Sequence, residues 1–260
     1  DHGDRRSVCQ AERGGIRMNY FVYNGVSSLD MGLRIESKNV FSAPEYDVTF
    51  QSIPGRNGDL ILPNGRYSNV QVTYSVFLPA KSIAELAEKI TKVKAWLYGE
   101  QNAYHTLSDS YDTVYTRKAV YSGSLDIEDQ LNRIGVFTVS FSCHPFRYSV
   151  AGTDPITLTQ SGSTVTNPES FESLPILTLT GEGTATLTIQ GGGQNKSWVF
   201  TGLDGSIVCD SEQMNFYSGT TPMNDKVSGD GFPRLQPGVN TISWVGTVTS
   251  LVVQPRWVTL

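Results

Sequence analysis

Residues 70–76 read Val-Gln-Val-Thr-Tyr-Ser-Val, so apolar and polar side chains alternate along the whole stretch. Successive side chains of an extended strand point to opposite faces, and this pattern therefore predicts a strand with one face in a core and the other in water. The same alternation returns at residues 136–143, with Phe137, Val139, Phe141 and Cys143 on the apolar side. The first part of the chain is therefore predicted to be built around a β-sheet.

One amphipathic helix is predicted between Ser82 and Gly99. Ser82 and Glu85 have the spacing of a capping box, in which the two side chains bond backbone amides at the start of a helix. Apolar residues then recur every three or four positions on one face, at Ile83, Leu86, Ile90, Val93 and Leu97. We expect this face to pack against the sheet and Gly99 to end the helix.

Glycine and proline are concentrated between Pro54 and Gly65, around the run Arg56-Asn57-Gly58-Asp59. A segment so rich in glycine cannot form a core of its own, because glycine has no side chain to bury. The pattern is typical of a turn, and we expect this one to project from the sheet.

The composition changes beyond a linker at residues 151–155, where Thr, Ser, Gly and Val dominate and helix formers are few. Strand-like runs at residues 176–180 and 185–189 flank Gly181-Glu182-Gly183, which predicts a hairpin, and residues 191–193 predict a further turn. Short strands at such spacing predict an all-β sandwich.

A length of 260 residues and this change of composition together predict two domains, at residues 18–150 and 153–260. Residues 1–17 are polar and unpatterned, and they precede Met18, which we interpret as the native start. We therefore expect residues 1–17 to be a non-native or disordered extension.

The charge and the cysteines exclude several classes of protein. Twenty Lys and Arg against 25 Asp and Glu give a formal net charge of -5, and the basic residues are scattered, which disfavours nucleic-acid binding. No apolar stretch approaches the roughly 20 residues that span a bilayer. Cys9, Cys143 and Cys209 form no C-x-x-C pair and no disulfide framework, and Cys143 is predicted to be a small core residue.

The residues that could perform chemistry are few. No G-x-S-x-G, H-E-x-x-H or G-x-x-x-x-G-K-[ST] motif occurs, and beyond residue 17 only His105 and His144 offer an imidazole. Two groups of carboxylates fit turns better than an acid and base pair: Asp109 with Asp112, and Asp126 with Glu128 and Asp129. Asp210 and Glu212 lack a calcium-loop pattern. We predict no enzyme, no cofactor and no metal.

The order of several motifs resembles that of siphophage distal tail proteins. In the first half the similar motifs are residues 54–60, residues 65–67, the helix ending near Trp96-Leu97, Tyr121-Ser122-Gly123 and residues 137–146. In the second half they are Asn167-Pro168, Pro175-Ile176, Gly181-Glu182-Gly183, residues 231–235, residues 237–240 and Pro255-Arg256-Trp257. Each is a short turn or strand motif, so the resemblance rests on their shared order from residue 18 to residue 260.

The resemblance implies a mainly β fold. An N-terminal β-sandwich or barrel-like domain with one α-helix and a projecting arm would precede a C-terminal galectin-like or jelly-roll β-sandwich. It also implies a structural protein of a long-tailed phage or prophage, which forms a hexameric ring joining the tail tube to the baseplate or tail tip. DNA would pass through the centre of the ring without specific binding.

The resemblance also implies partners and a location. The expected partners are further copies of the chain, the tail tube protein and a tail-tip hub protein of the tail-associated lysin type, without a membrane. The chain would be made in the host cytoplasm and would reside in the virion tail. The candidates for the ring or tube interface are Pro54, Gly55, Arg56, Asn57, Gly58 and Asp59.

An alternative function is a carbohydrate-binding adhesion module that contacts host glycans through the C-terminal domain. Several aromatic residues favour it because sugar-binding sandwiches present such rings to pyranoses: Trp198, Phe216, Tyr217, Trp244 and Trp257. Core positions explain most of these residues, and Trp198 and Tyr217 are retained as candidate glycan contacts. A third candidate, a cell-wall glycosidase, depends only on the carboxylates that turns explain better.

Overall fold

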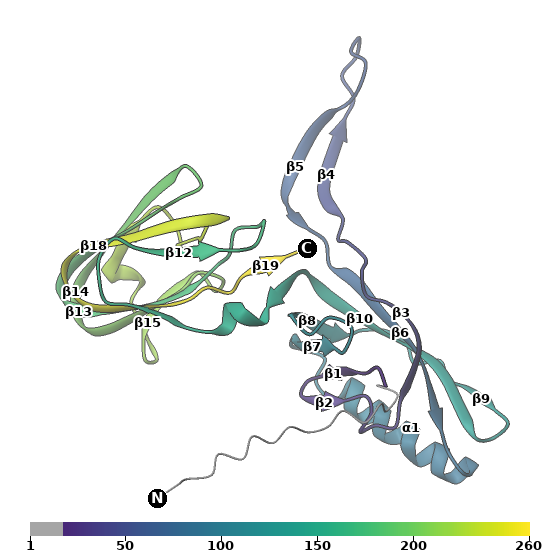
Figure 1. Cartoon of the computed structure of the whole chain (residues 1–260). Coiled ribbons are helices and arrows are strands. Elements are labelled where there is room, and N and C mark those ends of the chain that lie inside the picture. Colours follow the sequence, from purple (N-terminus) through teal and green to yellow (C-terminus); the bar gives the residue numbers. More distant parts are fainter. Residues whose placement is uncertain (1–17) are drawn as a thin grey trace, which may run out of the picture.

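The computed structural model describes residues 18–260, and the extension expected at residues 1–17 lies outside them. Two large antiparallel sheets with separate cores account for most of the described chain (Figure 1). A small two-stranded sheet stands apart from both. The prediction of a mainly β fold with one α-helix is confirmed for this part of the chain.

The first sheet is organised around its longest strand, β10 (Ile134–Ser149), which pairs with four others. The strand order is β2-β1-β7-β8-β10-β6-β3, with β9 and β19 also paired to β10. The other strands are β1 (Phe21–Tyr23), β2 (Val26–Ser27), β3 (Arg34–Asn39), β6 (Val70–Pro79), β7 (His105–Asp109), β8 (Tyr115–Tyr121), β9 (Glu128–Gln130) and β19 (Val258–Thr259).

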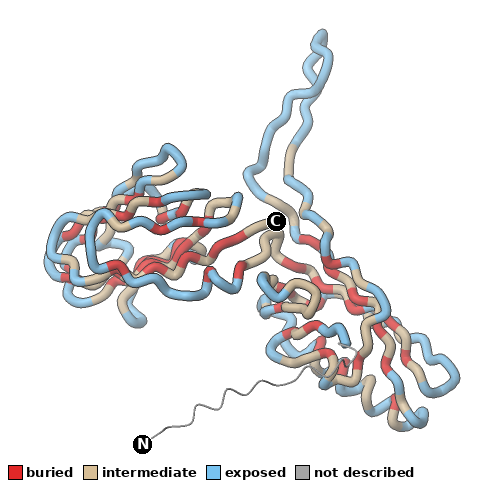
Figure 2. The backbone as a smooth tube through the Cα atoms, in the orientation of Figure 1, coloured by how far each residue is buried: buried red, intermediate tan, exposed pale blue. Residues whose placement is uncertain are grey.

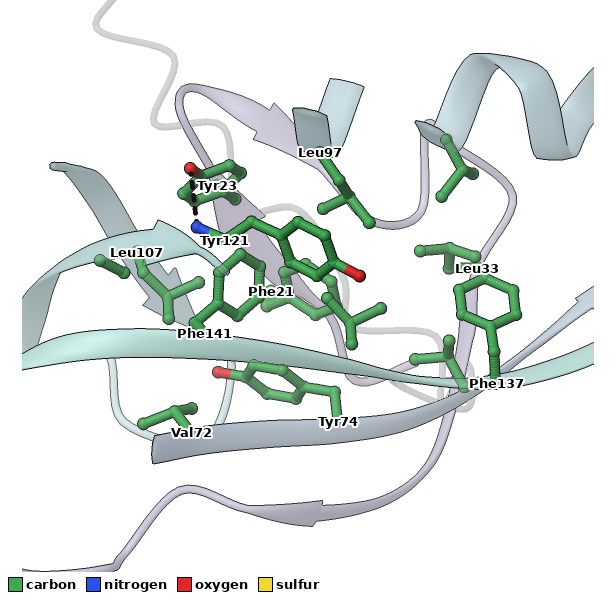
Figure 3. Close-up of a cluster of buried hydrophobic side chains, with 14 of the residues drawn as sticks. Phe21, Tyr23, Leu33, Val72, Tyr74, Leu97, Leu107, Tyr121, Phe137 and Phe141 are labelled. Atoms are coloured by element: carbon green, nitrogen blue, oxygen red, sulfur yellow. Dashed lines mark hydrogen bonds between the residues drawn. The ribbon is translucent and has the colours of Figure 1, made fainter. Parts of the chain in front are cut away.

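The two alternating stretches that predicted a sheet are neighbours in it. Val72 on β6 lies opposite Phe141 on β10, and every second residue is buried along β6 and along β10 as far as Cys143. The ring of Phe21 on β1 stacks on Tyr74 of β6 at 4.5 Å, although three strands separate β1 from β6 in the sheet (Figure 3). The sheet therefore curls around its own core, as the barrel-like prediction requires.

Helix α1 (Ile83–Tyr98) covers this core with Leu86, Val93 and Leu97, which are buried. Ser82 Oγ accepts a hydrogen bond from Glu85 N at 3.3 Å, while the Glu85 carboxylate accepts one from Lys81 N, one residue earlier than in a standard capping box. Gly99 ends the helix with φ of -62°, a right-handed conformation. Its role is therefore not that of a left-handed cap.

The second sheet has the order β11-β18-β13-β14-β15-β16, with β12 paired to β18 and β17 to β14. Its strands are β11 (Ile156–Leu158), β12 (Ser163–Asn167), β13 (Ile176–Gly191), β14 (Gln194–Asp210), β15 (Asn215–Ser218), β16 (Thr221–Pro222), β17 (Val227–Gly229) and β18 (Gly238–Gln254). Short 3-10 helices lie at η1 (Val150–Thr153) and η2 (Asn224–Lys226).

The predicted hairpin at Gly181-Glu182-Gly183 is wrong, because β13 continues through these residues. The strand is bulged there, and its neighbours also carry glycines in left-handed conformations at this level, Gly205 on β14 and Gly246 on β18. Residues from both halves of β13 belong to one core, so the long strands fold the sheet over on itself. The hairpin turn lies instead at Gly192 and Gly193, within the turn predicted at residues 191–193.

The end of the chain returns to the first sheet. Tyr148 and Arg147 on β10 pair with Val258 and Thr259 on β19. The sequence assigned residues 153–260 as a whole to the second domain, whereas the strands of the second sheet lie between residues 156 and 254. The final strand therefore ties the two domains together.

Candidate interaction surfaces: the arm and the domain junction

A two-stranded ribbon, which we name the arm (residues 46–67), extends away from both large sheets (Figure 1). It consists of β4 (Tyr46–Gln51) and β5 (Leu60–Tyr67). Nearly all of it is exposed to solvent (Figure 2). The projection predicted from the glycine-rich segment is therefore longer than a turn, because strands on both sides of that segment take part.

The six residues predicted as interface form the tip of the arm, and all are exposed: Pro54, Gly55, Arg56, Asn57, Gly58 and Asp59. Gly55 and Gly58 have φ of 80° and 83°, a left-handed region that side chains rarely adopt. These two glycines allow the chain to reverse at the end of the ribbon.

The register of the arm gathers apolar side chains on one face. Val48 lies opposite Pro63 and Phe50 opposite Ile61, and residues paired across a ribbon share a face. Phe50 is 61% exposed and Ile61 is 59% exposed. The other face is mixed, with Thr49 opposite Leu62 and Gln51 opposite Leu60. This apolar face could not be predicted from the sequence, because it depends on which residues of the two strands pair.

The base of the arm is fixed by polar contacts. Arg66 Nε and Asn64 Nδ2 donate hydrogen bonds to the Asp47 carboxylate at 2.7 and 2.8 Å. These bonds, and the one from Arg66 above all, hold the pKa of Asp47 below its usual range.

An isolated two-stranded ribbon is marginally stable at best, and an exposed apolar face marks a surface for association. The arm therefore has a fixed base and an apolar face suited to a partner.

An ion pair and two hydrogen bonds from tyrosine hydroxyls join the two domains. Lys118 Nζ on β8 lies 2.6 Å from Glu212 Oε1 in the C-terminal domain, and Tyr148 OH on β10 donates to the same carboxylate at 3.3 Å. Tyr115 OH donates to Glu169 at 2.9 Å. With the pairing of β10 and β19, these contacts hold the domains in one arrangement.

A chain of aromatic rings runs from the arm to the C-terminal domain. The ring centroids of Tyr46 and Tyr67 are 4.9 Å apart, those of Tyr67 and Phe146 5.6 Å, and those of Phe146 and Phe171 5.5 Å. Such contacts add stability beyond the area that they bury. The base of the arm therefore packs on β10, and β10 in turn packs on the C-terminal domain.

The two candidate glycan contacts lie in different surroundings. Trp198 is 1% exposed, and its Nε1 donates to the carbonyl of Gly231 at 2.7 Å. This corrects the expectation for Trp198, because a buried indole presents no face to a sugar. Tyr217 lies half-buried on β15, opposite Val208 of β14.

Asp109, Asp112 and the two histidines considered for catalysis have structural contacts. Asp109 accepts hydrogen bonds from Tyr74 OH and from two backbone amides of the turn that follows it. Asp112 pairs with Arg147 at 2.9 Å. His144 packs against Tyr104, and burial, together with the nearby charge of Lys118, lowers its pKa. His105 Nε2 lies 3.0 Å from the carbonyl of Glu100.

Among residues 18–260, no group of three or more His, Cys, Asp or Glu side chains could hold a metal ion. No helix of the described chain is both long and apolar enough to cross a membrane.

Comparisons with known proteins agree with this architecture. Residues 26–143 match the family described as phage tail protein RIFT-related domain. The structure is similar to that of SPP1 Dit (gp 19.1), described as a paradigm of the hub adsorption apparatus in phages that infect Gram-positive bacteria. That match has a TM-score of 0.71 at 13% identity and covers 91% of this chain and 98% of the other.

A second solved structure, a chain of the phage P2 baseplate in its activated conformation with calcium, matches with a TM-score of 0.50 at 9% identity. It covers 92% of this chain and 97% of that one. No curated protein matched the sequence. The predicted resemblance to siphophage distal tail proteins is confirmed by the family match and by the fold shared with SPP1 Dit.

Proposed function

We propose that the chain is a component of a phage tail, and within it a structural ring protein without enzymatic activity. The match of residues 26–143 to a phage tail domain and the fold shared with SPP1 Dit support this proposal. Copies of the chain close into a hexameric ring that joins the tail tube to the baseplate or tail tip. The partners are further copies, the tail tube protein and a tail-tip hub protein, and DNA passes through the centre.

The apolar face of the arm is the observation that carries this proposal. Identical subunits form a closed ring when one surface of each copy binds a different surface of the next. Phe50 and Ile61 lie on an exposed ribbon that reaches away from the body of its own chain. Such a ribbon suits a contact with the neighbouring copy, and its tip at residues 54–59 suits a contact with that copy or with the tube.

The charge of the chain fits the passage of DNA. A formal net charge of -5 on each copy gives the assembled ring a large negative charge. Proteins that bind DNA tightly neutralise phosphates with clustered Lys and Arg, and this chain has no such cluster in its sequence. A ring of such copies would let DNA slide without sticking.

The first test is the assembly state of the purified full chain, measured by negative-stain electron microscopy together with light scattering. Closed rings of about six copies are expected. The second part of the test is co-assembly with the tube protein, because the tube could be needed to complete the ring. A strict monomer at high concentration that also fails to assemble with the tube protein would overturn the proposal.

The alternative of a glycan adhesion module on the C-terminal sheet loses one of its two candidate residues, because Trp198 is buried. Tyr217 remains as a candidate and is half-buried on β15. The ring protein is therefore the function that the arm and the comparisons support best.

A further inference from the structure

A cleft of about 470 Å³ lies where the base of the arm, strand β10 and the C-terminal domain meet. Tyr67 and Arg66 contribute from the arm, Phe146 and Tyr148 from β10, and Phe171 and Arg234 from the C-terminal domain. Sites for small ligands usually measure roughly 300 to 1,000 Å³ and lie at domain junctions. The cleft therefore has the size and the position of a ligand site.

Aromatic side chains line much of the cleft. Tyr67, Phe146, Tyr148 and Phe171 are each partly exposed there. Tyr67 meets Phe146 at an interplanar angle of 78°, and Phe146 meets Phe171 at 65°. Rings packed edge to face do not cover one another fully, which leaves apolar surface for a ligand.

Every charged side chain that lines the cleft has an oppositely charged partner. The charged lining residues are Arg66, Arg234, Arg256, Glu172 and Glu212. Arg234 pairs with Glu172 within the lining, whereas Arg66, Arg256 and Glu212 pair with residues outside it, namely Asp47, Asp210 and Lys118. A phosphate, a nucleotide or a cationic ligand would find no unpaired counter-charge among these groups, so the cleft favours a neutral ligand.

The ion pairs also fix hydrogen-bonding groups beside the aromatic rings. Arg234 contacts the Glu172 carboxylate, and Gln236 Nε2 donates to the other oxygen of that carboxylate at 2.9 Å. An arginine presents several N–H donors in one plane, and a carboxylate presents several acceptor positions. Donors and acceptors therefore stand side by side at fixed positions on the wall.

We infer that this cleft binds a short neutral saccharide. The C–H face of a sugar ring is apolar and packs on an aromatic ring, while each hydroxyl both donates and accepts hydrogen bonds. Adjacent arginine donors and carboxylate acceptors satisfy such a hydroxyl on one wall. An extended peptide would instead pair its backbone with an open strand edge, whereas side chains line the cleft. This inference does not depend on the proposed ring, because every group belongs to one copy.

The test is ligand-observed saturation-transfer NMR on the full chain with glucose, galactose, N-acetylglucosamine, rhamnose, lactose and maltose as probes. Phe171→Leu keeps an apolar side chain but removes the aromatic ring. Arg234→Lys keeps the charge but removes the planar donor group. Tyr217→Ala removes the remaining candidate glycan contact on the outer face of β15 and therefore tests the alternative site. Circular dichroism of each variant checks that it remains folded.

At least one probe is expected to bind with a Kd of about 1 mM or tighter. Phe171→Leu and Arg234→Lys should each weaken that binding by about tenfold, and Tyr217→Ala should leave it unchanged. Absence of binding by all probes would overturn the inference, as would binding that Tyr217→Ala abolishes and the cleft variants do not.

A separate readout distinguishes a protein occupant. If Phe171→Leu changes the assembly state in light scattering while no saccharide binds, the cleft is a contact between copies and the inference is wrong. Saccharide binding by a monomer would support the inference even if the ring proposal failed.

Discussion

Arg256 and Asp210 form a double hydrogen bond, with Arg256 Nη1 and Nη2 donating to the two carboxylate oxygens at 2.7 and 3.0 Å. Asp210 ends β14, and Arg256 lies between β18 and β19, where the chain leaves the second sheet for the first. Arg256 has φ of 53°, and its backbone N–H donates to Gly152 at 2.8 Å. The pair therefore fixes the path of the strand that joins the two domains.

Arg256→Ala should destabilise the protein by about 3 kcal/mol, because Asp210 would stay buried without its counter-charge. Lys92→Ala is the control, since Lys92 and Glu88 form an exposed pair on α1 and its loss should cost about 0.5 kcal/mol or less. Thermal unfolding followed by circular dichroism measures both. Equal decreases of the melting temperature in the two variants would show that the buried pair stabilises the protein no more than a surface pair does.

The same pair should make stability depend on pH. Burial alone would raise the pKa of Asp210, but hydrogen bonds from Arg256 and from the amides of Gln213 and Glu212 outweigh it and hold that pKa below its usual value. The stabilisation is then present above the unfolded pKa of about 3.9 and is lost as the pH falls through the lower folded pKa. The stability difference between the unmodified protein and Arg256→Ala should therefore narrow below about pH 4. If the stability difference between the two proteins stays constant until both unfold in acid, this explanation is wrong.

Phe50→Asp should prevent ring assembly, because it places a charge in the apolar face of the arm that the neighbouring copy would cover. The monomer should stay equally stable, since Phe50 is already exposed. Gln51→Asp introduces the same charge one residue away on the opposite face, and assembly should persist. Light scattering and electron microscopy compare the two. Rings formed by Phe50→Asp would show that this face is not the contact.

Gly246→Ala should destabilise the C-terminal domain by about 2 to 3 kcal/mol. Gly246 has φ of 111°, and a Cβ atom there would collide with the backbone oxygen of Thr184 on β13. Gly183→Ala is the matched control, because its φ of 74° is also left-handed but a Cβ there meets no atom within 4 Å. That control should cost only about 1 to 2 kcal/mol. Chemical denaturation measures the free energy of unfolding of both variants. Equal decreases would mean that β13 and β18 move apart at Gly246 without an energetic cost.

Local patterns in the sequence were sufficient to predict the individual elements. The alternation at residues 70–76 and 136–143 predicted β6 and most of β10, and the spacing from Ser82 to Leu97 predicted α1 with its cap. The glycines around residues 54–59 predicted the tip of the arm. Each of these signals lies within one element and reports which side chains face water.

The apolar face of the arm, the cleft at its base and the burial of Trp198 were not predictable in this way. Phe50 lies opposite Ile61 only because of the register of the ribbon, and the cleft combines residues from three separate parts of the chain. The bend at residues 181–183 was mistaken for a hairpin because glycines also mark bulges inside a continuous strand.

The sequence by itself therefore determined the type of each element and the side that it buries, since both follow from periodicity along the chain. Only the tertiary structure decided which elements meet. The pairing of Tyr148 with Val258, more than a hundred residues apart, brings the end of the chain back to the first sheet. Such a contact depends on the packing of both domains at once, and no local pattern encodes it.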